Sequence, residues 1–250
     1  MKLAKVLLFI LFPIICFSQD AKEDLRLRTG VKLNMDLPKK FNFSVEYQYR
    51  VKNNISTFQG SYFSGNLEYA FVKNFLSGEV EYRYQTNYNR NVNVLGLGIT
   101  VKEEVKKFRF SNRLLFQQKF EYTGSEFEPG HEPYTYLRDK IEAKYKCSKK
   151  LDATLFAEPF FYLSGSQNEL RAIRFAAELD WEFKKRHTMN AFYYIQPGYG
   201  SASDKIIYTV GLMYKYELPK FWKKEKIRTV RTVTNSLLLT PSAVSRILYI

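Results

Sequence analysis

The stretch Phe41–Val51 reads FNFSVEYQYRV, and every second residue in it is apolar. Its odd-numbered positions hold only Phe, Val and Tyr, whereas its even-numbered positions hold Asn, Ser, Glu, Gln and Arg. Successive side chains of a β-strand point to opposite faces of the sheet. The stretch therefore predicts a strand with one apolar face and one polar, charged face.

The same alternation recurs along most of the chain, and no helical period of 3.6 residues competes with it. The segments are longer than most globular strands and suit a tilted span of a bilayer. We expect an all-β protein, an antiparallel up-and-down transmembrane β-barrel of 10–12 strands. The predicted strands are Leu25–Met35, Phe41–Val51, Ser61–Phe71, Leu76–Tyr88, Val92–Val101, Phe108–Tyr122, Thr135–Cys147, Ala153–Leu163, Arg171–Phe183, Thr188–Pro197 and Ile206–Tyr216.

The strand count leaves two arrangements open, because the pattern gives eleven segments and single-chain bacterial barrels have even numbers of strands. Ten strands beginning at Phe41 would leave Leu25–Met35 as an extra segment. Alternatively, the tail after Tyr216 would supply a twelfth strand. That tail is crowded with Lys and Arg and then loses its alternation, so we assign residues 220–250 to a basic C-terminal extension.

The connections between predicted strands alternate in length, as in barrels that pair short periplasmic turns with longer outer loops. The short ones are Asp36–Lys40, Val72–Phe75, Lys102–Lys107, Ser148–Leu151 and Lys184–His187, and the longer ones are Lys52–Gly60, Thr123–Pro133, Ser164–Leu170 and Gly198–Lys205.

The first residues have the composition of a secretory leader. Lys2 and Lys5 precede an apolar run, Val6–Phe17, that is well short of the roughly 20 residues of a spanning helix. We expect a signal peptide over residues 1–18, cleaved before Gln19, and a barrel over residues 19–219. Lipidation of Cys16 and retention of the leader as an anchor helix are the alternatives.

Composition and charge narrow the class of protein. Aromatic residues make up 17% of the chain, which suits sheets and membrane interfaces. The mean hydropathy of −0.35 does not argue against a membrane, because polar inner faces and apolar outer faces cancel in a barrel. The net charge is +14, and its basic residues are spread through strands and turns, which favours an anionic lipid surface over nucleic acid as a partner.

Charged residues on the polar faces form the largest candidate site. Isolated charges are costly in a confined interior, so we expect these residues to pair and fill the lumen, or else to set the selectivity of a polar channel or small-ligand site. The set is Glu46, Arg50, Glu68, Glu79, Glu81, Arg83, Arg109, Arg113, Arg138, Glu142, Glu158, Arg174 and Glu178.

Catalytic and metal chemistry find little support in the sequence. A Ser–His hydrolase needs a histidine beside its nucleophilic serine. The chain has two histidines, His131 and His187, and Ser125 is the candidate nucleophile near His131. Glu126, Glu128, His131 and Glu132 could bind a divalent cation, but their spacing fits no fixed calcium loop. We expect no enzyme activity, no catalytic residue, no cofactor and no resident metal.

Aromatic residues near the predicted strand ends suit the girdles that anchor barrels at membrane interfaces. They are Tyr88, Tyr122, Tyr134, Tyr162, Trp181, Tyr199 and Trp222.

A soluble lipocalin-like barrel, with apolar residues inside, shows the same alternation and is the main alternative fold. The strand number, the aromatic content and the charged faces favour the membrane.

Several segments resemble one protein family. EPFFYL at Glu158, LRAIRFAAELDWEF at Leu170, MNAFYYIQPGY at Met189 and IIYTVGLMYKYEL at Ile206 are similar to the DUF2490 family of outer-membrane proteins from the Bacteroidetes, as are FSVEYQYR and YLRDKIEAKYK. The resemblance covers most of residues 25–216. It implies an outer-membrane barrel of uncharacterised function and supplies no catalytic residues.

These observations predict an outer-membrane barrel of a Gram-negative bacterium that contacts outer-membrane lipid. Its expected role is that of a narrow polar-lumen channel or a barrel that binds a small solute. The alternatives are a surface-exposed binding or adhesion barrel that acts through its outer loops, chiefly Thr123–Pro133, and a lipid-directed barrel hydrolase.

Overall fold

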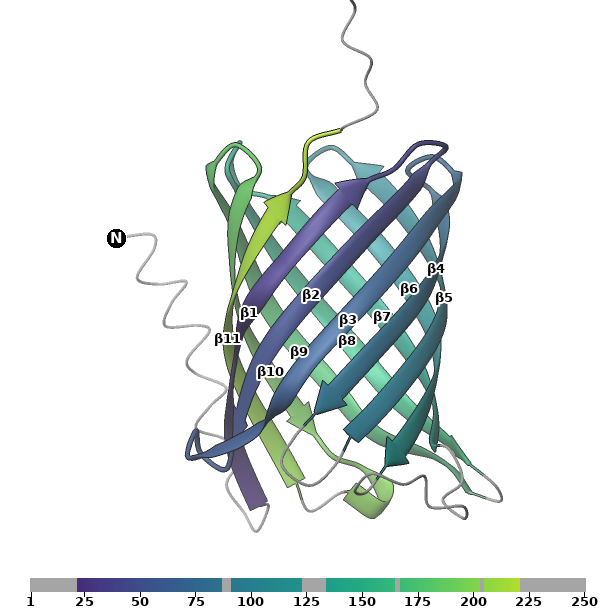
Figure 1. Ribbon diagram of the computed structural model, residues 1–250, viewed down its shortest axis with the longest axis vertical. Helices are drawn as coiled ribbons and strands as arrows, with labels where there is room; N and C mark the ends of the chain where they lie inside the picture. Colours follow the sequence, from purple (N-terminus) through teal and green to yellow (C-terminus); the bar gives the residue numbers. More distant parts are fainter. Residues whose placement is uncertain (1–21, 87–90, 123–133, 165–166, 203–204, 221–250) are drawn as a thin grey trace, which may run out of the picture. The chain divides into compact units, whose positions relative to one another are not determined.

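The computed structural model describes residues 22–86, 91–122, 134–164, 167–202 and 205–220, which form a closed barrel of eleven strands (Figure 1). None of the described helical residues belongs to a helix long and apolar enough to cross a membrane. The strands are β1 (Lys22–Asp36), β2 (Phe41–Lys52), β3 (Thr57–Val72), β4 (Leu76–Thr86), β5 (Asn91–Val105), β6 (Phe108–Tyr122), β7 (Tyr134–Lys146), β8 (Leu151–Ser164), β9 (Gln167–Lys184), β10 (His187–Pro197) and β11 (Lys205–Glu217), and the short 3-10 helix η2 (Gly200–Ala202) precedes β11.

The predicted strands are all present, and most are longer than the alternation indicated. β6 has the predicted bounds, Phe108–Tyr122, whereas β5 continues past Val101 to Val105. The longer strand follows from pairing with β6, which continues to Val105↔Phe108 through side chains that are charged and exposed at the barrel end. Backbone ladders therefore run beyond the apolar pattern that revealed the strands.

The barrel closes through a parallel pair, which corrects the expectation of an even, wholly antiparallel barrel. β1 pairs antiparallel with β2 and parallel with β11, from Lys22↔Lys205 to Asn34↔Glu217. In an up-and-down order with an odd number of strands, the first and last strands run in the same direction. β1 is thus neither an extra segment nor in need of a twelfth partner, because β11 satisfies its free edge.

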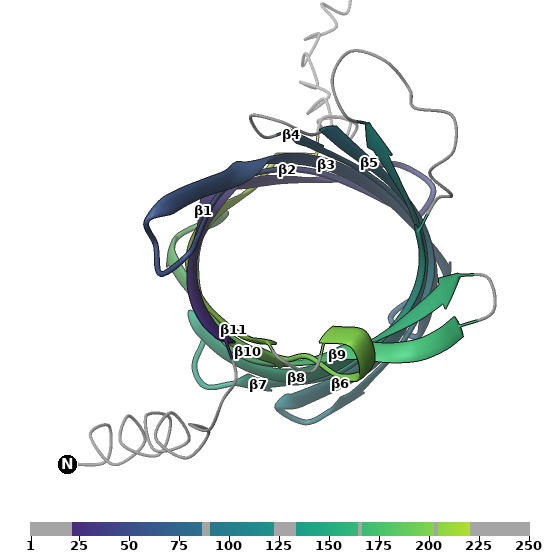
Figure 2. The same ribbon diagram turned by 90° about the horizontal axis from the view of Figure 1, so that it is seen from below.

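The connections lie on two rims. We call the end with β1–β2, β3–β4, β5–β6, β7–β8 and β9–β10 the turn rim, drawn at the top of Figure 1, and the other end, seen from below in Figure 2, the loop rim. Two predicted long loops are wrong, because β3 begins at Thr57 and β9 at Gln167. Asn53, Asn54 and Ile55 all have positive φ, which lets the β2–β3 connection turn tightly.

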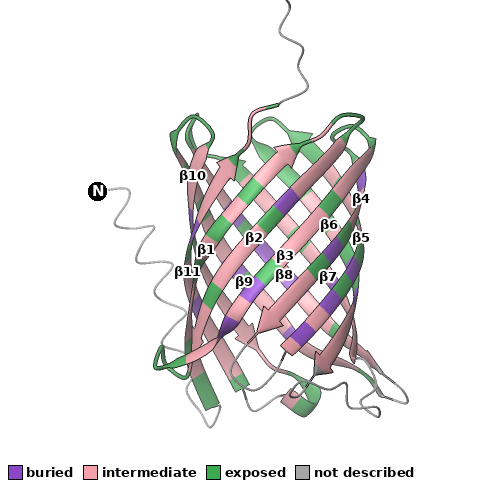
Figure 3. Ribbon diagram, in the orientation of Figure 1, coloured by how far each residue is buried: buried purple, intermediate pink, exposed green. Residues whose placement is uncertain are grey.

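The two faces of the barrel wall have opposite polarity, as the alternation predicted. Large apolar side chains are exposed on β1 to β9 and on β11, and Leu97, Ile141 and Leu155 are 61%, 60% and 64% exposed. The buried residues include Glu158, Asn190 and Thr209 together with apolar residues of the inner face. In Figure 3 exposed and buried positions accordingly follow one another along the same strands.

The ladder between β7 and β8 is interrupted at one point. Pairs are present at Arg138↔Phe160 and at Ile141↔Ala157, with the same register on both sides of the gap. Pro159 lies inside the gap, and proline has no N–H to donate to a neighbouring strand. The strand continues because its other edge still pairs, through Pro159↔Ile173.

Gly211 on β11 is a position where the packing of the inner face excludes a side chain. A Cβ at Gly211 would overlap the ring of Phe192, which is buried opposite it on β10. We expect Gly211→Ala to lower the free energy of unfolding by about 1–3 kcal/mol through overpacking. Denaturant unfolding of the barrel in detergent micelles measures the change.

Gly65→Ala is the matched control, because a Cβ at Gly65 would meet no atom within 4 Å. It should shift stability by less than about 0.5 kcal/mol. Equal midpoints for the two variants would contradict the packing described for Gly211.

Candidate functional site

The strand register places all thirteen predicted charged residues on the inner face of the barrel. On each strand they share that face with the buried residues of neighbouring strands, as when Glu81 pairs with Asn66 and Gly96, or Glu158 with Arg174. The structure does not join them into one network. They form several groups distributed around and along the wall.

The most buried group centres on Glu158 of β8, which is 2% exposed. Its Oε1 accepts hydrogen bonds from Arg138 at 2.6 and 3.1 Å, and its Oε2 accepts one from Arg174 at 3.1 Å. Arg138 also donates to Gln117 at 3.0 Å, and Arg174 donates to Gln196. One carboxylate thus holds two guanidinium groups, and glutamine amides satisfy more of their donors.

The second group lies on β4 and β6. Arg113 contacts Glu79 at 2.5 Å through Nε and Glu81 at 3.2 Å through a terminal nitrogen. Glu81 also pairs with Arg83, its neighbour on the same face of β4. Asn66 of β3 donates to the other oxygen of Glu79 at 2.6 Å. Here two carboxylates hold two guanidinium groups.

The other predicted residues pair locally. Glu68 contacts Lys102 at 2.7 Å, Glu142 contacts Lys140 at 2.5 Å and Glu46 lies 3.8 Å from Lys32. Glu178 accepts a hydrogen bond from the Tyr194 hydroxyl at 3.1 Å, and the exposed Arg109 pairs with Glu104 near the turn rim. Arg50 packs its guanidinium on the Tyr62 ring, 3.4 Å from the ring centroid.

A further group near the turn rim was missed in the choice of site residues. Asp180 contacts Lys215 at 2.8 Å and Lys144 at 3.2 Å, and Lys144 also reaches Asp152 at 3.1 Å. These residues border a polar cavity of about 290 Å³ that also contains Lys146. The alternation had already placed Lys144 and Asp180 on polar faces, so the signal was present. Arg28 of β1 was omitted in the same way.

Two carboxylates at strand ends have lowered pKa values. A hydrogen bond from Lys220 lowers the pKa of Asp36; partial burial opposes this shift, and Asn42 adds a second hydrogen bond. Hydrogen bonds from the Ser201 side chain and backbone lower the pKa of Glu169 at the loop rim. The Asp36–Lys220 contact ties the end of β1 to the segment after β11, beside the parallel pair.

Aromatic side chains gather on the outer face at the turn rim. Trp181 and Phe183 lie in contact there, and His187 packs against Phe183 and Tyr216 while its Nδ1 lies 2.6 Å from the Tyr214 hydroxyl. His187 is therefore surrounded by aromatic rings rather than by a nucleophile.

The residues predicted to form an aromatic girdle do not all lie on the outer face of the wall. Trp181 is 53% exposed on the outer face, as expected. Tyr134 and Tyr162 instead belong to the inner face, where they contact each other and where Lys119 and Arg171 approach their rings. Tyr134 alternates in phase with Arg138 and Tyr162 with Glu158, so the period of two along β7 and β8 turns both rings inward. Tyr88 and Trp222 lie outside the described residues.

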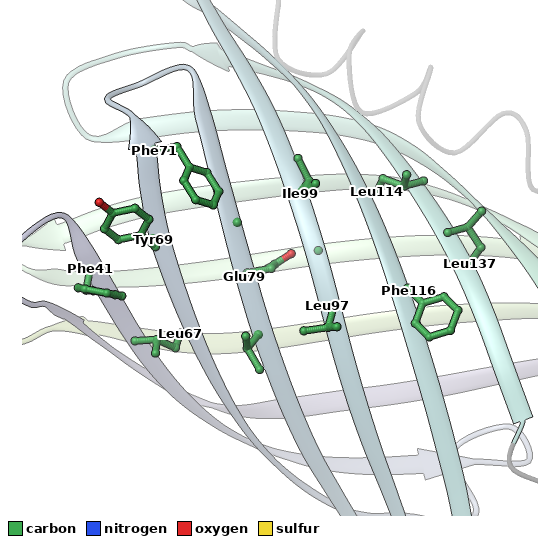
Figure 4. A pocket seen from close by; sticks show the side chains of 13 residues that line it. Phe41, Leu67, Tyr69, Phe71, Glu79, Leu97, Ile99, Leu114, Phe116 and Leu137 are labelled. Atoms are coloured by element: carbon green, nitrogen blue, oxygen red, sulfur yellow. The ribbon is translucent and has the colours of Figure 1, made fainter.

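The outer face is hollowed over β2 to β7, where Gly78 of β4 places no side chain on the wall. The hollow has a volume of about 590 Å³ and is lined by apolar residues such as Phe71, Leu97 and Phe116 (Figure 4).

A polar pair interrupts the apolar surface beside this hollow. Asn112 of β6 donates to Asp139 of β7 at 2.5 Å, and the register places both on the outer face.

The residues considered for hydrolysis or metal binding in the long loop, Ser125, Glu126, Glu128, His131 and Glu132, lie outside the described residues. So do the predicted signal peptide and nearly all of the basic extension. Within the described strands and turns, no group of three or more His, Cys, Asp or Glu is arranged to hold a metal ion. Cys147 is exposed at the turn rim.

Comparison with known proteins identifies the family. A family model described as "Protein of unknown function (DUF2490)" matches residues 27–206, from within β1 to the start of β11. The chain belongs to the DUF2490 family. The matched region contains β2 to β10 complete, so the DUF2490 pattern is a pattern of barrel strands. No curated protein matches the chain.

Glu158 is the residue on which the most buried DUF2490 ion pairs depend. Glu158→Gln would leave Arg138 and Arg174 buried without a counter-charge, so we expect it to lower the free energy of unfolding by about 3–5 kcal/mol. Denaturant midpoints in detergent measure the loss.

Glu104→Gln is the control, because it removes a carboxylate from an ion pair with Arg109 whose two side chains are each 49% exposed. It should cost about 0–1 kcal/mol. A loss as small for Glu158→Gln would show that the inner ion pairs do not stabilise the barrel.

Proposed function

We propose that this DUF2490 protein is an outer-membrane β-barrel of a Gram-negative bacterium, delivered by a cleaved signal peptide, whose polar lumen passes or binds a small solute. The role is non-catalytic. The observation that carries the proposal is the reversed polarity of the wall, with apolar residues outside and charged residues inside. Such a surface is costly in water and favourable in a bilayer.

The borders of the apolar surface support the membrane assignment. On the outer face of β5, the run Leu95, Leu97, Ile99 and Val101 is followed by Glu103 toward the turn rim and preceded by Asn93 toward the loop rim. An apolar band between polar ends is the arrangement of strands that cross a bilayer. The aromatic residues around Trp181 lie where an interfacial girdle would be.

The Asn112–Asp139 pair opposes the membrane assignment, because it costs free energy to place a charged group against lipid. The 2.5 Å hydrogen bond from Asn112 supplies a donor to the carboxylate inside the apolar surface. The neighbouring hollow of about 590 Å³ is apolar and has room for part of an acyl chain.

The inner face supports a role for the lumen. Its ion pairs Glu158–Arg138, Glu158–Arg174 and Glu79–Arg113 hold charged side chains in fixed positions along the wall. Fixed charges in a narrow pore select solutes by sign and by hydrogen bonding. If these charged side chains filled the cross-section of the lumen, the barrel would bind a solute without letting it pass through.

A charged substitution on the outer face, halfway along a strand, tests whether the wall is surrounded by a bilayer or by water. Leu97 is 61% exposed at the middle of β5, so in water Leu97→Lys would change stability by less than about 0.5 kcal/mol. In lipid we expect a loss of about 2–4 kcal/mol, measured by reversible unfolding from vesicles.

Val105→Lys is the matched control on the same strand. Val105 also faces outward but lies beyond Glu103 at the turn rim, so the same change should cost about 0–1 kcal/mol. Equal small effects at Leu97 and Val105 would contradict insertion of this face into lipid.

Fractionation and conductance test the location and the role directly. We expect the protein in the outer-membrane fraction, with gel migration that changes on heating because the folded barrel resists denaturation in detergent. In planar bilayers a passing lumen gives stepwise conductance. Recovery of a folded monomer from aqueous buffer without detergent would overturn the membrane assignment, whereas an inserted barrel without conductance would favour binding over passage.

A further inference from the structure

Two arginines face each other on the inner wall beside the parallel pair. Arg28 of β1 and Arg50 of β2 are direct cross-strand neighbours, and the side chain of Arg28 lies beside the Tyr194 ring of the inner face. Like charges directly opposite one another on a sheet are destabilising. A stable barrel with this pair calls for a counter-charge nearby.

The described part of the chain supplies none. Neither Arg28 nor Arg50 has a carboxylate within 4.0 Å in the described strands and turns, although Arg50 Nε donates to the neutral Gln48 at 2.7 Å. Arg28 Nε is buried and has no hydrogen-bond acceptor. The pair therefore carries uncompensated charge and at least one unused donor.

The nearby carboxylates are already engaged, Glu178 by hydrogen bonds from the Tyr194 hydroxyl and the Asn190 amide. Glu158 holds Arg138 and Arg174, and Glu81 holds Arg83 and Arg113 with the help of Glu79. Glu46, one position along β2 from Gln48 on the same face, accepts from Gln48 and lies near Lys32. Four other guanidinium groups thus form ion pairs with only three carboxylates, Glu79, Glu81 and Glu158. None of these carboxylates pairs with Arg28 or Arg50.

The surroundings add positive charge and flat aromatic walls. The guanidinium of Arg174 lies 5.4 Å from the centroid of the Tyr194 ring, and that of Arg28 lies 5.6 Å from the same centroid. The Tyr194 ring thus has two guanidinium groups beside it, and Arg50 is the cross-strand neighbour of one of them, Arg28. Arg28 and Arg50 are half-buried, so a solute that enters the lumen can reach them.

We propose that Arg28 and Arg50 form a binding site for a small oxyanion, a phosphate or a phosphate ester, inside the barrel. The inference deepens the proposed function, on which it rests, by naming the class of solute. Guanidinium groups are planar forks of donors that match two oxygens at once, which favours an oxyanion over a halide. The bound anion supplies the missing counter-charge and accepts hydrogen bonds from the terminal nitrogens of Arg28 and Arg50.

The test uses inorganic phosphate and the purified full-length barrel folded in detergent. Thermal unfolding is followed with rising phosphate, against potassium chloride at equal ionic strength. When phosphate exceeds its dissociation constant about tenfold, we expect the midpoint to rise by roughly 3–6 °C for the unchanged protein. By calorimetric titration, Arg28→Gln and Arg50→Gln should each weaken phosphate binding about 10–100-fold.

The variants are expected to fold, because each removes one charge of a repelling pair and should leave the midpoint in phosphate-free buffer unchanged or higher. Lys73→Gln, which removes one positive charge from the exposed β3–β4 turn, is the charge-matched control and should retain the full phosphate response. This control separates a local site from the net charge of the protein.

Two results would overturn the proposal. One is a midpoint that responds to phosphate no more than to chloride, and the other is a phosphate response that survives in Arg28→Gln and Arg50→Gln. Conductance and fractionation test the proposed function separately from these binding experiments. A barrel that conducts but does not bind phosphate would overturn the oxyanion site alone. A barrel that does not conduct but binds phosphate through Arg28 would support the oxyanion site and indicate that the role is binding.

Discussion

Closure of the sheet is the constraint on which the rest of this DUF2490 barrel depends. The edge strand of an open sheet presents a row of unpaired N–H and C=O groups, and only closure of the sheet into a barrel removes every edge. The parallel ladder between β1 and β11 removes the last edge and allows an odd number of strands. The ladder is continued beyond β11 by a hydrogen bond of 2.8 Å from Leu218 N to the Asn34 carbonyl.

A closed wall gives each strand an inside and an outside, and the two faces obey different rules. Outside, apolar side chains such as Leu155, which is 64% exposed, need no hydrogen-bond partner. Inside, every charged group must find hydrogen bonds in a confined space, which explains why Glu158 serves two arginines and why Gln117 and Gln196 complete their contacts. The inner face is thus the part of the wall where polar side chains depend on one another for their hydrogen bonds.

The charge balance of the lumen is uneven around the wall. From β4 to β9, carboxylates and guanidinium groups interleave and satisfy one another. Beside the parallel pair, Arg28 and Arg50 lack carboxylates in the described residues, and this is the section of the wall that β1 adds to the antiparallel series. The strand that closes the barrel, β1, therefore contributes Arg28 to the excess positive charge, and its neighbour β2 contributes Arg50.

The sequence by itself determined the strands and their two faces, because a period of two is a local property that FNFSVEYQYRV already displays. It also placed the thirteen charges on the polar faces, along with Lys144 and Asp180, which were passed over. Only the tertiary structure decided the parallel closure and the pairing of Glu158 with Arg138 and Arg174. These depend on which strands become neighbours and in what register, and contacts between residues far apart in sequence leave no mark in local alternation.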